Sequence, residues 1–308
     1  LSETITSGGD HYVKFFHQWK ITFSATTVNA GTPMNSSNYV TVTYTSTNNT
    51  QSVHIWDSHS ETVWADCGSQ FIYSQESSTS TSQHRWRTNE SLIGTVSYST
   101  AQSGVSKNYY EQVYLTLDNG GHDTGYSEGE LFGLSHSAFG PGSSWYDVGC
   151  NVTIWVDSPV GGDWIRYRFD HWEDGSGNTV STNNPFSFTM PSVDGITRVA
   201  VWVTQYKLAV KTQGISPPNY TAVYINGVQE GSANDNSPFY KWYDAGSSTG
   251  TIGVDDYVGG YYIRSYFDHW IENDGSNGGS DNPHASFTMN SPYNLTAVYV
   301  EKYRLIVS

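Results

Sequence analysis

The stretch Tyr266-Phe267-Asp268-His269-Trp270 repeats Arg168-Phe169-Asp170-His171-Trp172 almost letter for letter, roughly a hundred residues further along the chain. After each copy, an Asn-Pro pair leads to a Phe-Thr-Met triplet. A fixed period of this length indicates a tandem array of whole domains. The two copies of the second pattern are Asn184-Pro185 with Phe188-Thr189-Met190, and Asn282-Pro283 with Phe287-Thr288-Met289.

A third element follows the same period. Trp145-Tyr146-Asp147-Val148-Gly149 recurs as Trp242-Tyr243-Asp244-Ala245-Gly246. A degraded version, Trp64-Ala65-Asp66-Cys67-Gly68, lies in the N-terminal third of the chain. The array therefore has at least three members, and the first has diverged furthest.

The joints between repeats are very short. Each repeat closes with an alternating run, and the next repeat opens two residues later, at Tyr206 or Tyr303. Such a joint is far stiffer than a flexible linker, so we expect a rod. Extended backward, the pattern opens the first repeat at Trp19 and makes 12–16 the closing strand of a repeat that is not there. The predicted parts are an N-terminal segment at 1–18, domains at 19–112, 113–205 and 206–302, and an orphan opening strand at 303–308.

The composition excludes several classes of protein. Lys and Arg number 14 against 29 Asp and Glu, for a net charge of −15. A nucleic-acid partner is not expected, because the phosphate backbone is bound by basic surfaces. No apolar run approaches the ~20 residues of a membrane span. The chain is rich in Tyr, Trp and Gly and poor in the residues that fill helices, which predicts an all-β protein.

Period-2 alternation is the dominant local pattern. Val40-Thr41-Val42-Thr43-Tyr44 and Val152-Thr153-Ile154-Trp155-Val156 place alternate β-branched or aromatic residues on one face of a strand. Clusters of Gly, Asn, Asp and Ser between such runs supply turns. About seven strands in each repeat predict three tandem β-sandwich domains of immunoglobulin-like type, with orphan strands at both termini. A β-grasp fold is the alternative.

Several features place the protein outside the cell, at the cell surface. The chain has few lysines, an acidic charge, two cysteines and six Asn-x-Ser/Thr sequons. We expect Cys67 and Cys150 to be oxidised, either in an intrachain bond that folds the first two domains against each other or in a bond between subunits. N-linked glycans are expected at Asn35, Asn48, Asn89, Asn151, Asn219 and Asn294.

The repeated aromatic, acidic and imidazole groups are predicted to be structural. A catalytic centre is needed once, whereas a core contact is needed in every domain. We expect Asp147 and Asp244 to bond turn amides, and His171 and His269 to form structural hydrogen bonds. Four tryptophans are expected to pack in the cores: Trp145, Trp172, Trp242 and Trp270.

Known catalytic motifs are missing from the sequence. It has no metalloprotease helix motif, Walker loop or Cys-x-x-Cys pair, and Gly133-Leu134-Ser135-His136-Ser137 lacks the second Gly of a serine nucleophile elbow. We predict no enzyme activity, no catalytic residue and no organic cofactor. Turns at Asp174 and Asp274 offer several oxygens, so calcium is the one metal expected there. Both turns lack the ligand spacing of an EF-hand loop, and ordinary hairpin turns are the alternative.

The anchors resemble the tandem repeats of large secreted surface proteins, common in archaea and also seen in bacteria, that are described as divergent internalin-type or bacterial repeat domains. The likeness covers about two thirds of the chain well and 19–112 poorly, and His171 and His269 stand where that family usually has Gly. It implies an extracellular structural or adhesive role and supplies no catalytic residue. The matching positions are Trp145, Phe169, Trp172, Asn184-Pro185, Trp242, Phe267, Trp270, Asn282-Pro283 and Thr296-Ala297-Val298.

Together these features predict an extracellular structural protein, the subunit of a surface filament or surface layer. An unpaired strand exposes a ladder of N–H and C=O groups, so the cut ends of the pattern predict that this homopolymer assembles head to tail by β-strand addition. The alternative is that these ends are only where a longer repeat protein was cut. The alternatives are an adhesin or carbohydrate-binding module, and the non-catalytic stalk of a secreted hydrolase. The subunit interface is expected at Tyr12, Val13, Phe15, Phe16, Tyr303, Leu305 and Val307.

Overall fold

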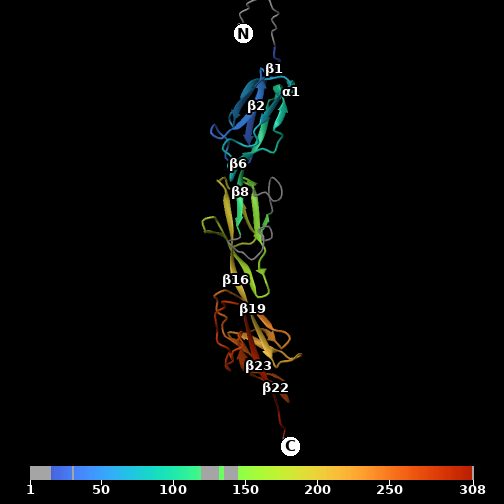
Figure 1. Cartoon of the computed structure of the whole chain (residues 1–308), viewed down its shortest axis with the longest axis vertical. Coiled ribbons are helices and arrows are strands. Elements are labelled where there is room, and N and C mark those ends of the chain that lie inside the picture. Colours follow the sequence, from blue (N-terminus) through green and yellow to red (C-terminus); the bar gives the residue numbers. More distant parts are fainter. Residues whose placement is uncertain (1–14, 30, 119–131, 135–144, 307–308) are drawn as a thin grey trace, which may run out of the picture.

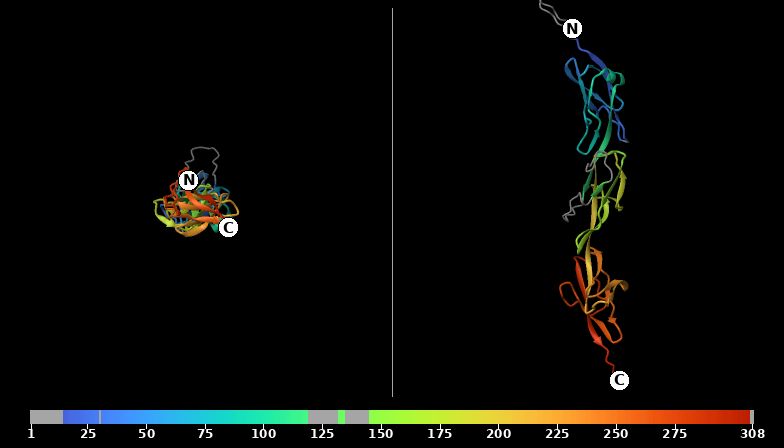
Figure 2. Two further views of the ribbon diagram at one scale, coloured as in Figure 1. Left: turned by 90° about the horizontal axis from the view of Figure 1, so that it is seen from below. Right: turned by 90° about the vertical axis from the view of Figure 1, so that its right-hand side faces the viewer.

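The computed structural model describes residues 15–29, 31–118, 132–134 and 145–306. Within these ranges the chain is almost entirely strand and turn, with one short helix, α1 (Tyr98–Ser103). No helix in the described ranges is long and apolar enough to cross a membrane. Three domains follow one another along a rod (Figure 1, Figure 2). The predicted all-β tandem fold is therefore confirmed.

Each domain is a sandwich of two sheets. One sheet has 13 strands, runs the length of the rod and serves all three domains, and each domain adds a smaller facing sheet of its own. In domain 1 the long sheet contains β1 (Gln18–Thr27), β4 (Glu61–Asp66), β6 (His84–Arg87) and the first half of β8 (Val105–Asp118). The facing sheet contains β2 (Val40–Ser46), β3 (Asn49–Ile55), β5 (Gln70–Tyr73) and β7 (Ile93–Thr95).

Domains 2 and 3 are built in the same way. In domain 2 the long sheet contains the second half of β8, β10 (Trp145–Asp147), β12 (Val160–Gly161), β13 (Ile165–Glu173), β14 (Thr179–Ser181) and the first half of β16 (Ile196–Gln213). The facing sheet of domain 2 contains β9 (Phe132–Leu134), β11 (Asn151–Val156) and β15 (Phe186–Thr189). In domain 3 the long sheet contains the second half of β16, β19 (Phe239–Asp244), β21 (Tyr257–Gly259), β22 (Ile263–Ile271) and β23 (Tyr293–Tyr303). The facing sheet of domain 3 contains β17 (Thr221–Ile225), β18 (Val228–Ala233) and β20 (Ile252–Val254).

The three domains share one strand order in the long sheet. The opening strand pairs antiparallel with an edge strand and parallel with the closing strand: β1 with β4 and β8, then β8 with β10 and β16, then β16 with β19 and β23. The closing strand pairs antiparallel with β6, β13 or β22. Domain 1 therefore has the topology of the other two, although its copy of the sequence pattern is degraded.

Two strands belong to two domains each. β8 closes domain 1 and opens domain 2, and β16 closes domain 2 and opens domain 3. With 18 residues, β16 is about 60 Å long at ~3.3 Å per residue. The joint between domains is thus continuous β-strand rather than a linker, which explains the rod.

Each domain has its own buried core, spanning 21–109, 113–200 and 208–299. Trp172 and Trp270 are 0% exposed, and each packs on the Phe of its own motif with ring centroids 5.4 Å and 5.2 Å apart. These two tryptophans are core residues, as predicted. The Asn-Pro element ends a strand of the facing sheet: the side chain of Asn184 hydrogen-bonds both the amide and the carbonyl of Val156, and the later copy repeats these bonds.

The two ends of the rod differ from the expected orphan strands. Phe15 and Phe16 precede β1 and are in no strand, while β23 ends at Tyr303 and 304–306 are in no strand. Beyond the end of β23 the amide of Arg304 donates to the carbonyl of Tyr262, and no further ladder bond from 305–306 follows among the described residues. The remainder of both predicted orphan strands, at 12–14 and 307–308, lies outside the described residues.

Candidate functional site

Each joint between domains is bridged by a glutamine on the shared strand. At joint 1, between domains 1 and 2, Nε2 of Gln112 donates to Oδ1 of Asp147 (2.9 Å), and Oε1 of Gln112 accepts from Nε of Arg85 (2.9 Å). Arg85 belongs to domain 1 and Asp147 to domain 2. Gln112 and Arg85 are 0% and 8% exposed, so these charge-assisted hydrogen bonds are little weakened by water.

Joint 2, between domains 2 and 3, repeats this bridge. Nε2 of Gln205 donates to Oδ1 of Asp244 (2.7 Å), and Oε1 of Gln205 accepts from Nε of Arg166 (2.7 Å). The register also repeats, because Arg166 faces Gln205 in the pairing of β13 with β16. Arg85 faces Gln112 in the same way in the pairing of β6 with β8. The Arg–Gln–Asp bridge is therefore a repeated element of the rod.

A tryptophan completes each joint. Cζ of Arg85 lies 4.0 Å from the ring centroid of Trp145, and Cζ of Arg166 lies 4.3 Å from that of Trp242. In both cation–π contacts the charge comes from one domain and the ring from the next. Desolvation lowers the pKa of both guanidinium groups. Both remain charged at physiological pH, because an arginine pKa starts so high.

Trp145 and Trp242 are not core residues, so this part of the sequence prediction is wrong. Successive side chains of a strand point to opposite faces. Tyr146 is 0% exposed in the core of domain 2, so Trp145 and Asp147 lie on the opposite face of the sheet, where they contact Arg85 and Gln112. Asp147 and Asp244 both accept a hydrogen bond from a bridging glutamine, whereas the bonds from turn amides expected of their carboxylates stay a prediction.

Joint 1 also contains a buried carboxylate. Glu111, 0% exposed, precedes Gln112 on β8. Its carboxylate accepts hydrogen bonds from the Thr32 amide and the Ser192 hydroxyl, and its Oε1 lies 2.6 Å from Nε2 of His84. Thr32 and His84 belong to domain 1 and Ser192 to domain 2. Glu111 therefore ties the two domains together a second time.

Joint 2 has a cation among aromatic rings instead. Nζ of Lys207 lies 5.2 Å from the ring centroids of Trp164 and Trp242, and 4.9 Å from that of Tyr240. Trp164 comes from domain 2, whereas Trp242 and Tyr240 come from domain 3. The lysine thus adds a further contact between the domains.

The N-terminal end of the rod presents half of a joint. Nε2 of Gln18 on β1 donates to Oδ1 of Asp66 (2.9 Å), as the bridging glutamines do at the joints. Among the described residues, no donor reaches Oε1 of Gln18 and no cation lies over the ring of Trp64, which is 58% exposed. We call Gln18, Trp64 and Asp66 the N-terminal face.

The C-terminal end presents the other half. Arg264 of β22 faces Lys302 of β23, in the register that places an arginine opposite a glutamine at both joints. The amide of Arg304 donates to the carbonyl of Tyr262 (2.9 Å), and the corresponding bond at joint 2 is 3.0 Å long. The chain therefore leaves domain 3 along the path that it takes inside the rod. We call Arg264, Lys302, Tyr303 and Arg304 the C-terminal face.

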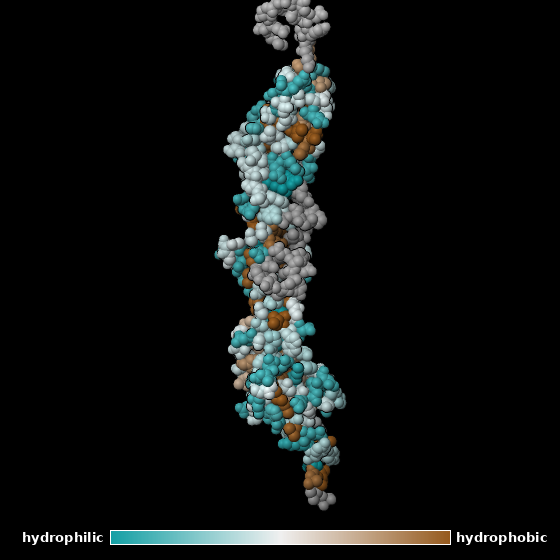
Figure 3. All heavy atoms as spheres, viewed as in Figure 1, coloured by the Kyte–Doolittle hydropathy of each residue, from teal (hydrophilic) through white to brown (hydrophobic). Residues whose placement is uncertain are grey.

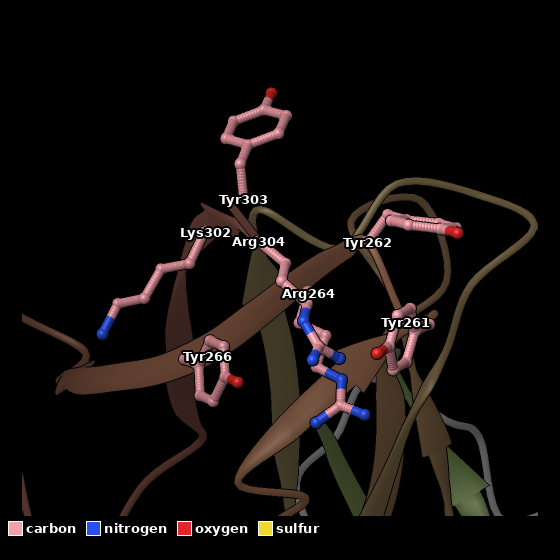
Figure 4. A pocket seen from close by; sticks show the side chains of 7 residues that line it. All are labelled: Tyr261, Tyr262, Arg264, Tyr266, Lys302, Tyr303 and Arg304. Carbon is pink, nitrogen blue, oxygen red and sulfur yellow. The ribbon is translucent and has the colours of Figure 1, made fainter. Parts of the chain in front are cut away.

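The C-terminal face borders a hollow of about 420 Å³. Each of its three cations lies over a tyrosine ring, at 4.0 to 5.0 Å from the ring centroid. In Figure 4 the two guanidinium groups lie between Tyr261 and Tyr266, whereas Tyr303 points away from them. The residues lining the hollow are Tyr261, Tyr262, Arg264, Tyr266, Lys302, Tyr303 and Arg304.

The predicted interface residues that the structure describes are exposed at the two ends. The exposed fractions are 88% for Phe15, 36% for Phe16, 73% for Tyr303 and 85% for Leu305. Apolar surface is visible at the C-terminal tip in Figure 3. Tyr12, Val13 and Val307 lie outside the described residues.

Cys67 and Cys150 are not brought together. Both thiols are free, and burial raises the pKa of Cys150 to about 11. Cys67 lies beside the start of β1 and Cys150 beyond its far end, so the ten residues of β1 separate them by about 33 Å at ~3.3 Å per residue. A disulfide needs Cα atoms within about 7 Å. The intrachain bond therefore does not form here, and the bond between subunits stays a prediction that non-reducing electrophoresis checks.

The turns at Asp174 and Asp274 satisfy their carboxylates with their own donors. Oδ1 of Asp174 accepts from the amides of Ser176 (2.8 Å) and Asn178 (3.0 Å), and Oδ1 of Asp274 accepts from the amide of Ser276 (2.9 Å). Hydrogen bonds from Asn178 and from Ser276 lower the pKa of the respective carboxyl groups. The described part of the chain has no group of three His, Cys, Asp or Glu that could hold a metal. Calcium binding stays a prediction, which an unchanged melting temperature in millimolar calcium would contradict.

The sequons differ in accessibility. Asn294 is partly buried in β23, and its Nδ2 donates to Oδ1 of Asn273 (3.2 Å), so a glycan there would have to replace that bond. Glycosylation stays a prediction, and an intact mass equal to that of the bare polypeptide would contradict it. The exposed sequons are Asn35, Asn48, Asn89, Asn151 and Asn219.

The bridging glutamines were not found from the sequence, although a signal for them exists. Gln18, Gln112 and Gln205 each stand directly before the first residue of a predicted domain, and Lys302 stands at the corresponding place before Tyr303. The arginines gave no comparable signal, since Arg85 lies in the degraded first repeat. Side chains that meet only across a strand pairing are hard to match before the register is known.

No family model matches this chain, and no curated protein matches it. The solved structure of the pilus adhesin SpaC from Lactobacillus rhamnosus GG, in its open conformation, is similar at 13% identity and a TM-score of 0.28, over 95% of this chain and 44% of that one. The Bacillus anthracis TIE protein is similar at 9% identity and a TM-score of 0.23, over 92% of this chain and 51% of that one. This chain therefore spans about half the length of these proteins.

Proposed function

We propose that this chain is an extracellular, non-enzymatic structural protein: a rod-shaped subunit of a surface filament or surface layer that assembles head to tail by β-strand addition. The observation that carries this proposal is the single long sheet. It passes through three domains by way of shared strands and reaches each end of the rod at half of a joint. A contact between two unlike ends is heterologous and does not close, so it generates a fibre.

The C-terminal segment has the sequence of an opening strand. Leu305 corresponds in the strand register to Leu115 and Leu208, which are 2% and 0% exposed in the cores of domains 2 and 3. Leu305 itself is 85% exposed. An apolar residue in this position favours pairing of the segment with a further strand that covers it, and in the proposed filament a neighbouring subunit supplies that strand.

The partner of this segment cannot be the opening position of domain 1, because β1 already fills it and pairs on both sides with β4 and β8. We propose instead that 303–308 of one subunit pairs with 12–16 of the next. Phe15 and Phe16 lie just before β1, separated from it by His17, so such a pair would extend the long sheet from one subunit toward the next.

Negative-stain microscopy of the purified chain tests this function. Filaments or sheets built from end-to-end rods are expected, and a protein that stays as single rods at high concentration would refute the proposal and favour a stalk. Deletion of 1–16 should abolish polymers while leaving the thermal unfolding of the three domains unchanged. Filaments that still form from that variant would refute strand addition through the N-terminal segment.

The hollow at the C-terminal face supports a second candidate function, carbohydrate binding by an adhesin. Tyrosine rings can stack on sugar faces, and three cations beside them suit an acidic sugar. A rod that stays monomeric and binds acidic oligosaccharides saturably in calorimetry, with loss of binding on Tyr261→Ala, would favour this function over filament assembly.

A further inference from the structure

We infer that the edge of domain 1 formed by β3 binds a second copy of this chain: β3 of one molecule pairs antiparallel with β3 of another, about a two-fold axis at Ser52. The contact lies on the flank of the rod, between its two ends. It would join rods side by side, which goes beyond the proposed assembly from end to end.

β3 is an edge strand with a row of unused backbone groups. Among the described residues it pairs only with β2, through an unbroken register along its whole length. The turn between the two strands has two residues, both with positive φ, so Ser46 and Asn49 on either side of it form a hydrogen-bonded pair. Bonded pairs alternate along an antiparallel ladder, so the N–H and C=O groups of Thr50, Ser52 and His54 point away from β2.

The equivalent edge of domain 3 is protected, whereas β3 is not. β18 pairs with β17 as β3 pairs with β2, but a bulge interrupts its register and it carries Glu230, which lies 2.9 Å from Lys241 of β19. Bulges and charged residues are two of the ways in which proteins prevent pairing at an edge. β3 has neither, contains no proline, and with 7 residues exceeds the usual strand length. An edge left open in this way favours a partner strand.

The charge pattern favours a second copy as that partner. Residues 21–56 contain no Asp, Glu, Lys or Arg, in a protein whose net charge is −15. Two copies repel each other over much of their surface, and at this edge they can approach without that repulsion. The next two acidic groups already have partners within domain 1, because Asp57 accepts from two backbone amides and Glu61 lies 2.8 Å from His59.

The edge is also complementary to itself. In an antiparallel pair centred on Ser52, this residue faces its own copy, and Thr50 of each chain faces His54 of the other. All three residues have outward N–H and C=O groups, so each facing pair can exchange two hydrogen bonds. The side chains of all three are exposed. The pairing brings hydroxyl groups together and places no acidic group opposite another.

The pairing would place two rods side by side. β3 runs lengthwise in domain 1, from the turn whose amides bond Asp66 beside the start of β1 to the turn at Asp57, which bonds Thr27 at the end of β1. A two-fold contact uses the same surface on both copies and closes at two molecules, so it pairs rods or filaments without itself producing a fibre. The glycan predicted at Asn48 would lie at the first turn, outside 50–54.

Substitutions of Ser52 in the full chain test the inference. Its side chain is exposed and its N–H is not bonded to β2, so the fold of domain 1 should be retained, which thermal unfolding checks. Ser52→Lys and Ser52→Asp each place two like charges opposite each other, and each should weaken side-by-side association roughly 5-fold in sedimentation velocity. Ser232→Lys, the same change at an exposed position of β18, is the matched control and should associate like the wild type.

Mixing the two charged variants gives the sharpest outcome. The introduced lysine then faces the introduced aspartate, so the mixture should associate at least as strongly as the wild type. Ser52→Pro, which removes the outward N–H of an edge strand, should weaken association roughly 30-fold through the loss of two hydrogen bonds. A mixture no stronger than either variant alone, or variants that all associate like the wild type, would overturn the pairing at β3. Wild-type rods or filaments that remain single in negative-stain microscopy would overturn it as well, and single filaments would leave end-to-end assembly standing.

Discussion

Joints 1 and 2 share one bridge but differ in what surrounds it. Both have the arginine, the glutamine, the aspartate and the tryptophan on a continuous strand. Joint 1 adds the buried carboxylate of Glu111, whereas the residue before Gln205 at joint 2 is Thr204, and the added contact there is Lys207 among aromatic rings. The strand and its register define the geometry of a joint, and the neighbouring side chains then determine how strongly the two domains are coupled.

The largest expected effect follows from the carboxylate. Glu111→Ala leaves the Thr32 amide and the Ser192 hydroxyl without their buried acceptor, so we expect a loss of about 3 kcal/mol in the free energy of unfolding of the coupled domains 1 and 2. Thr204→Ala, at the matching position of joint 2, should change it by less than about 0.5 kcal/mol. Denaturant titration measures both. Equal effects would show that the two joints do not differ in this way.

We expect substitution of the bridging glutamine also to destabilise joint 1 more than joint 2, but with a smaller difference between the two joints. Methionine keeps the length of the side chain but offers neither hydrogen bond. Gln112→Met should cost about 2 kcal/mol and Gln205→Met about 1 kcal/mol, because Arg85 is buried and Arg166 is only partly so. In calorimetry, each variant should show more separate unfolding transitions than the wild type, because the two domains beside the altered joint no longer unfold together. A greater loss of stability in Gln205→Met than in Gln112→Met would contradict this expectation.

The smallest effect concerns the histidines of the repeated motif. The ring nitrogens of His171 lie 2.9 Å from Asp170 and 3.0 Å from Glu173, whereas His269 has one such contact, 2.8 Å from Asp268. Hydrogen bonds to Asp170 and then to Glu173 raise the pKa of His171. The stability gained from its charged form is full below the unfolded pKa of about 6.5 and is lost as pH rises through the folded pKa.

We therefore expect the melting temperature of domain 2 to decrease slightly as the pH rises above about 6.5. The His171→Gln variant should lose this dependence on pH. The His269→Gln variant controls for loss of the ring alone. Calorimetry across this pH range measures the effect. An unchanged pH slope in His171→Gln would assign it to other groups.

The sequence predicted the repeat, the all-β fold and the buried Trp172 and Trp270, because periodicity and alternation report which side chains face a core. The same alternation, applied to Trp145 beside Tyr146, would have turned Trp145 out of the core, but the shared motif suggested one role for every tryptophan. The partners of Arg85 and Arg166 depend on strand register, which the sequence leaves open. The end faces could be recognised only after two internal joints supplied the template.

The central claim is that each joint is continuous strand, bridged at Gln112 or Gln205, with no linker. Hydrogen exchange of the backbone amides tests this most directly. Amides at 110–114 of β8 and 203–207 of β16 should exchange as slowly as those of the same strands on either side, since releasing them requires breaking the long sheet. A short run of rapidly exchanging amides at either glutamine, between protected flanks, would contradict the claim and show that the domains are joined by a hinge.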